Sequence, residues 1–112
     1  WYTTSDERIK KDITDSTVGL TEIKQLQVRN FKYRTDAEIT EVDFGALSET
    51  GTQVGIIAQE VESVIPSAVD VSDKGVKGVD NDPIFWAMVK AIQELSTENT
   101  ALAARITTLE SA

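Results

Sequence analysis

A heptad repeat in the last third of the chain is the feature that most constrains its fold. Apolar side chains recur at steps of three and four from position 85 to position 109, and neither Gly nor Pro interrupts residues 84–112. Asp82 is a suitable N-cap, and Pro83 would then occupy the first helical position, where its missing N–H costs nothing. The repeat therefore predicts a coiled-coil oligomerisation helix over residues 83–112, about three and a half heptads long.

The a and d positions of this repeat form the predicted seam of the coiled coil. They are Phe85, Ile92, Asn99 and Ile106 at a, and Met88, Leu95, Leu102 and Leu109 at d. Asn99 at an a position is typical of a residue that fixes the register. The helix could instead lie along its own domain, but the rest of the chain is too short to cover it beyond Leu95. We therefore favour self-association, and Ile at a with Leu at d indicates a two-stranded coil.

The fold class predicted for the whole chain is α+β, with a small mixed domain over residues 5–82 preceding the long helix. Its strands are predicted from alternating or short apolar runs, and Asp73-Lys74-Gly75 is a plausible hairpin turn. The elements expected are a helix over 18–27 capped by Thr17, strands over 28–34, 39–44 and 54–57, a helix over 59–65 that Pro66 ends, and a hairpin of 69–71 with 76–79.

Composition excludes several function classes. The 112 residues include no His and no Cys, which rules out a Ser-His-Asp triad and thiolate chemistry. The net charge of −8 disfavours nucleic acid as a partner, and no apolar run approaches the roughly 20 residues that span a membrane. Acidic clusters at 36–38, 41–43 and 60–62 match no calcium loop, and solvated faces explain them better. We expect no metal, no cofactor and no small-molecule substrate.

One catalytic route survives in the segment that runs from Ser5 to Lys10. A Ser hydroxyl needs a base to take its proton, and without His a neutral Lys is the obvious base in this chain. Five residues rotate by about 140° on a helix and reverse the face of a strand. A bend after Ser5, or a Lys from another subunit, is therefore required. The residue types alone favour the alternative of a solvated, charged segment without chemistry.

Four segments occur in the order in which a known family carries them. They are Ser5–Ile13, Leu20–Tyr33, Val54–Glu62 followed by Pro66, and Ala91–Leu95. The first resembles the opening of the peptidase S74 family, the C-terminal intramolecular chaperone domains of endosialidases, phage tail spikes and tail fibres. The third is similar to the family's Gly-Phe-Ile-Ala-Gln-Glu-Val-like run, and the last to the Ala-Ile-Lys-Glu-Leu that opens its terminal coil.

The resemblance implies a homotrimer that helps the preceding fibre or spike to fold and then cuts itself off. The implied cleavage site is the Thr4–Ser5 bond, with Ser5 as nucleophile and Lys10 as general base. Residues 1–4 would then belong to the parent protein, and the opening Trp1 in place of Met leads us to expect a fragment of a longer chain. Folding would occur in the host cytoplasm during virion assembly. The parent would stay in the phage tail, and the released chaperone would be absent from the mature virion.

Two other interpretations remain open at this stage. The same domain could be a permanent trimerisation cap whose Ser5 and Lys10 are present but misaligned. Alternatively, the chain could be a generic coiled-coil oligomerisation module, which predicts the dimer that the Ile and Leu pattern indicates rather than a trimer.

Overall fold

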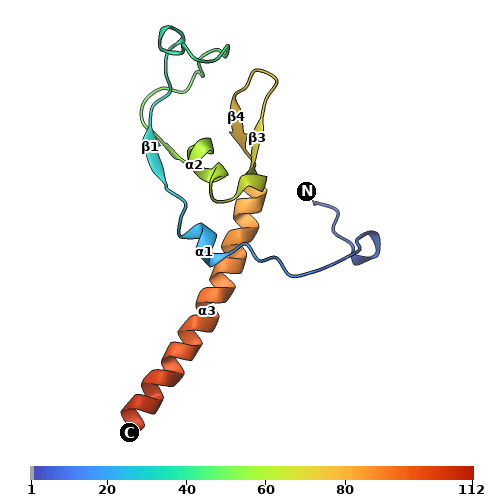
Figure 1. The fold of residues 1–112 in the computed structure, drawn as a ribbon, viewed down its shortest axis with the longest axis vertical. Coiled ribbons are helices and arrows are strands. Elements are labelled where there is room, and N and C mark those ends of the chain that lie inside the picture. Colours follow the sequence, from blue (N-terminus) through green and yellow to red (C-terminus); the bar gives the residue numbers. More distant parts are fainter. Residues whose placement is uncertain (1) are drawn as a thin grey trace.

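The chain folds into a small body at the beginning of one long helix, with an extended N-terminal arm (Figure 1). The computed structural model describes residues 2–112; Trp1, part of the segment assigned above to the parent protein, lies outside the described residues. The molecule measures 67 × 42 × 27 Å and its radius of gyration is 20.0 Å. A compact chain of this length would have a radius of gyration of about 13 Å. Short antiparallel strands beside a long C-terminal helix confirm the α+β class.

The long helix, α3, spans Asn81–Ser111. It begins two residues earlier than predicted, because Asp80 rather than Asp82 is the N-cap: the Asp80 carboxylate accepts a hydrogen bond of 3.0 Å from the Asp82 N–H. Pro83 consequently occupies the third helical position instead of the first. It is tolerated there because the first four N–H groups of a helix have no intrahelical acceptor. Among the described residues, no helix combines the length and apolar character that crossing a membrane requires.

Helix α3 carries two different apolar faces. One face packs on the body through Ala87 and Ala91, which are 2% and 3% exposed. The heptad positions follow these residues by one, which rotates them by about 100° around the helix axis. Their side chains lie open to solvent, with Ile92 67% and Leu102 53% exposed. The structure therefore leaves the whole heptad face uncovered, and coiled-coil assembly through it stays a prediction.

The body contains two separate antiparallel strand pairs. In the first, β1 (Arg29–Phe31) pairs with β2 (Gln53–Gly55) so that Asn30 faces Val54. In the second, β3 (Val69–Val71) and β4 (Lys77–Val79) form the expected hairpin. Strand β3 has the predicted bounds, whereas β1, β2 and β4 are shorter than predicted. In each pair three residues of one strand face three of the other, and pairing ends there.

The two short helices are also shorter than predicted. Helix α1 spans Leu20–Ile23 with Gly19 as its N-cap, so the expected cap at Thr17 is wrong. The Leu20 N–H donates to the Glu94 carboxylate of α3 at 2.9 Å, and this tertiary contact sets where α1 begins. Helix α2 spans Ala58–Glu62 and gives way to turns before Pro66, which opens a short 3₁₀ turn.

The strand expected over residues 39–44 is wrong. That stretch is irregular and follows a 3₁₀ turn at Asp36–Glu38. The Glu38 carboxylate accepts from the Thr35 N–H at 2.9 Å, and Asp36 accepts from the Ala46 N–H at 2.8 Å. These side-chain contacts close the segment into a loop, and no neighbouring strand in the described part of the chain is paired with it.

The hydrophobic core is small and lies where α2 meets the first turns of α3. Val61, Ile65, Ala68 and Ala87 are buried together, and partly buried side chains from α1 and the hairpin surround them. Two of these four are alanines, so the apolar area that the core removes from water is modest. A body with so small a core gains stability if the exposed face of α3 is covered by other chains.

Candidate active site

A single 3₁₀ turn brings Ser5 and Lys10 together. The turn, η1, spans Glu7–Ile9, and the Lys10 N–H closes it by donating to the Glu7 carbonyl at 3.0 Å. Lys10 Nζ then lies 2.7 Å from Ser5 Oγ. The bend that the spacing of these two residues requires is therefore present within one chain, and no Lys from another subunit is needed to form the contact.

Asp6 is the N-cap of this turn. Its Oδ1 accepts from the Arg8 N–H at 2.9 Å, while the Arg8 guanidinium donates to both carboxylate oxygens, the shortest contact being 2.8 Å. The hydrogen bonds from the Arg8 side chain, and then from its backbone, lower the pKa of Asp6. Sequence reasoning missed the turn, although an Asp directly after Ser5 is a typical N-cap signal.

The site lies on an arm that projects away from the body (Figure 1). Residues 2–17 are exposed throughout, and this range includes Thr4, Ser5 and Lys10. Ile9 and Ile13 on the same arm are 67% and 66% exposed. After the turn, Asp12 adopts a φ of 54°, a left-handed conformation that Asp tolerates better than most residues. Within residues 2–112 of a single chain, the arrangement provides a nucleophile and a base in contact, but no enclosure that would exclude water from them.

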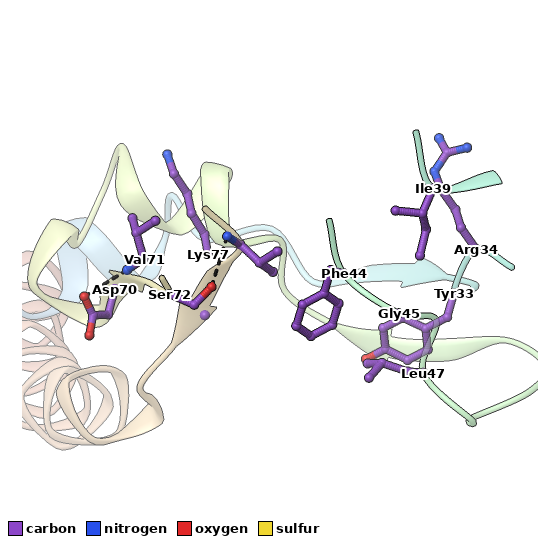
Figure 2. A pocket seen from close by; sticks show the side chains of 12 residues that line it. Tyr33, Arg34, Ile39, Phe44, Gly45, Leu47, Asp70, Val71, Ser72 and Lys77 are labelled. Carbon is purple, nitrogen blue, oxygen red and sulfur yellow. Dashed lines mark hydrogen bonds between the residues drawn. The ribbon is translucent and has the colours of Figure 1, made fainter. Parts of the chain in front are cut away.

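The body carries a groove whose lining includes no residue of the arm (Figure 2). It is a half-open groove of about 650 Å³ between the loop after β1 and the β3–β4 hairpin. Tyr33, Phe44 and Leu47 line one side and Val71 and Val76 the other. Figure 2 shows the ring of Phe44 between the hairpin residues and Tyr33. The sequence predicts a strand over residues 39–44, where the structure has a loop, so it gives no sign of this groove. None of the groove residues belongs to the Ser5 segment.

In two of the three acidic clusters, 36–38 and 60–62, the carboxylates make contacts within the protein. Glu60 pairs with Arg29 at 2.7 Å, and that hydrogen bond lowers the pKa of Glu60. The Thr35 N–H likewise lowers the pKa of Glu38. Over residues 2–112, no three acidic side chains are grouped in a way that could hold a metal ion.

Comparison with known proteins adds an independent observation. The sequence profile of the peptidase S74 family, described as the chaperone of endosialidase, matches residues 5–70, which is more than half of the chain. Myelin regulatory factor homolog 1 of Caenorhabditis elegans is 32% identical over 92 residues, covering 81% of this chain. The chain spans only about a tenth of that relative's length. The profile match begins at Ser5, the residue that follows the expected cleavage site, and the chain therefore belongs to the peptidase S74 family of endosialidase chaperones.

Proposed function

We propose that this chain is an intramolecular chaperone that assembles as a homotrimer and then releases itself by cutting the Thr4–Ser5 bond. The observation that carries this proposal is the 2.7 Å contact between Lys10 Nζ and Ser5 Oγ. The contact occurs at the first residue of the family match, directly after Thr4. Membership of the family supports the chaperone role and a general peptidase activity; the roles of Ser5 and Lys10 are our proposal.

The chemistry follows from the two side chains in contact. Neutral Lys10 accepts the hydroxyl proton of Ser5, and Ser5 Oγ attacks the Thr4 carbonyl carbon. The C–N bond between Thr4 and Ser5 breaks, its nitrogen takes the proton back from Lys10, and an ester joins Thr4 to Ser5 Oγ. Water then hydrolyses the ester, which leaves a carboxylate on Thr4 and a free amine on Ser5. Each chain carries out this reaction once, on itself.

Assembly would supply what the exposed site lacks. A Lys acts as a base only where its surroundings disfavour the ammonium form, and burial does so. The uncovered heptad face of α3 is a surface through which three copies could associate. If packing between copies encloses the arm, cleavage depends on assembly. The partners would then be two further copies of this chain and the phage fibre or spike chain that precedes Ser5, folding in the host cytoplasm before the chaperone leaves.

Intact mass spectrometry of the full natural chain tests this proposal. We expect the unmodified chain to yield a product that begins at Ser5, whereas Ser5→Ala and Lys10→Ala chains remain uncut. The matched control is Lys11→Ala, which removes the neighbouring exposed Lys and should leave cleavage unchanged. Equal cutting in all four chains would rule out the proposed pair.

A second candidate function is a permanent trimerisation cap that never cuts. The exposure of both Ser5 and Lys10 favours it, because nothing in the described part of a single chain encloses the two side chains or excludes water from them. This candidate predicts that the full natural chain stays in one piece after assembly, so that a denaturing gel shows one band at every time point.

A further inference from the structure

Among the described residues, the Asp6 carboxylate accepts hydrogen bonds from Arg8 alone. Oδ1 accepts from the Arg8 N–H at 2.9 Å and from Arg8 Nε at 3.1 Å, and Oδ2 accepts from Arg8 Nη2 at 2.8 Å. The Asp6 side chain therefore caps the turn, and it also forms a bidentate ion pair with Arg8, the second residue of the turn. Two-pronged Arg–carboxylate pairs hold a more defined geometry than single contacts do.

The turn that Asp6 caps has little other support. It is one short 3₁₀ turn, spanning Glu7–Ile9, and none of its residues is buried. Isolated 3₁₀ turns are weak, because their hydrogen-bond geometry is poor and nothing follows to propagate them. Tertiary packing does not hold this one within the chain, so its conformation depends on the cap and on two backbone hydrogen bonds, from the Ile9 and Lys10 N–H groups.

The same turn determines whether the proposed nucleophile and base meet. Ser5 immediately precedes the cap, and Lys10 is the residue that ends the turn. If residues 6–9 adopt an extended conformation, successive side chains point to alternating sides of the backbone. Ser5 and Lys10 are five positions apart, so their side chains then point to opposite sides. The 2.7 Å contact between Lys10 Nζ and Ser5 Oγ exists only while the turn is formed.

We propose that Asp6, held by Arg8, is a positioning residue for the Ser5–Lys10 pair. Its carboxylate keeps the turn closed and so keeps the two reacting groups within hydrogen-bond distance. This inference rests on the proposed self-cleavage, but it concerns a residue that exchanges no proton and touches neither reacting atom. The hydrogen bonds from Arg8 lower the pKa of Asp6, which agrees with a carboxylate that is held as the cap of the turn.

Cleavage rates of variants in the full natural chain test the inference. We expect Asp6→Ala to slow cleavage about five- to tenfold, because loss of an N-cap typically lowers the equilibrium constant for helix formation by a similar factor. Asp6→Asn should restore the rate to within about twofold, because Asn caps as well as Asp does. The cleavage rate of Arg8→Ala should lie between the rates of Asp6→Ala and Asp6→Asn. Glu7→Ala is the matched control, since it removes a neighbouring exposed carboxylate outside the cap and should cut at the natural rate.

A second measurement separates this inference from the proposed function. In an uncut Ser5→Ala background, three-bond HN–Hα couplings at residues 7–9 report helical backbone angles by NMR. We expect helical values in that background and with Asp6→Asn added, and extended-chain values with Asp6→Ala added. Helical couplings in the Asp6→Ala chain, or cleavage of that chain at the natural rate, would overturn the inference. If Ser5→Ala itself is cut, the proposed function fails, and the couplings still decide whether Asp6 holds the turn.

Discussion

Gly19 lies directly against α3, where a side chain has no room. A Cβ built on Gly19 would collide with the Glu94 carboxylate and lie 2.8 Å from Lys90 Cγ. If Glu94 moved away, its hydrogen bond with the Leu20 N–H would be lost, because the Glu94 carboxylate is the acceptor. The absence of a side chain at position 19 therefore lets α1 begin against the long helix.

We predict that Gly19→Ala lowers the free energy of unfolding by about 1 kcal/mol, the usual net contribution of one such hydrogen bond. Gly78→Ala is the matched control, since nothing lies within 4 Å of the Cβ that it would add. Urea unfolding of the two variants and the natural chain measures the difference. Equal stability of the two variants would show that Glu94 moves aside without loss.

At the scale of the element, α3 acts as two surfaces on one helix. Ala87 and Ala91 are small because the body packs against them, whereas the residues that follow them by one are large and exposed. Sequence periodicity alone did not distinguish these faces, since Ile84, Ala87 and Ala91 are also spaced by three and four. Contact with α1 and α2 is what assigns one face to the body and leaves the heptad face for other chains.

We predict that Leu102→Asp abolishes self-association while the body stays folded. A charge at a d position would be buried in the seam of a coiled coil, where no partner neutralises it. Sedimentation equilibrium should then give the mass of a single chain, and far-UV circular dichroism should still show the folded body.

Ala104→Asp provides the control for Leu102→Asp, because residue 104 is the heptad position farthest from the seam. It places the same charge in the same part of the helix, and the oligomer should keep its mass. An unchanged mass in both variants would contradict a coiled coil through these positions.

At the scale of the whole molecule, the dimensions and the core do not match those of a self-sufficient globular domain. The radius of gyration of 20.0 Å exceeds the value of about 13 Å for a compact chain of this length. Beyond Ala91, the rest of α3 is exposed to its end. The N-terminal arm is also exposed, although it carries Ile9 and Ile13. Both extensions present apolar surface at the periphery, which favours assembly as the source of much of the stability.

We predict that thermal unfolding depends on protein concentration. For a trimer whose separated chains unfold, a tenfold increase in concentration should raise the melting temperature by about 4 °C. Circular dichroism melts over a hundredfold concentration range measure this dependence. A chain that ends at Leu95 keeps the body and loses four of the eight seam positions, so its melting temperature should be lower and should depend less on concentration. A constant melting temperature for the natural chain would contradict stabilisation by assembly.

Features that depend on short-range sequence patterns could be predicted from the sequence alone. The heptad spacing located the long helix, and the turn residues located the hairpin. The assignment of Ser5 and Lys10 as nucleophile and base rests on the resemblance of residues 5–13 to the family motif, because the residue types alone did not favour it. The turn that Asp6 caps was not predicted, although capping acts over two or three residues and an Asp after Ser5 is a short-range signal of it.

Features that depend on contacts between residues distant in the chain could be known only from the folded structure. Residues 39–44 have strand-like composition but no strand to pair with, so they form a loop. Helix α1 begins at Leu20 because Glu94 of α3 accepts the hydrogen bond of its N–H. Contacts across the fold likewise determine which face of α3 is buried against the body. Local preferences are weak compared with such contacts, which is why the tertiary structure prevailed wherever the two disagreed.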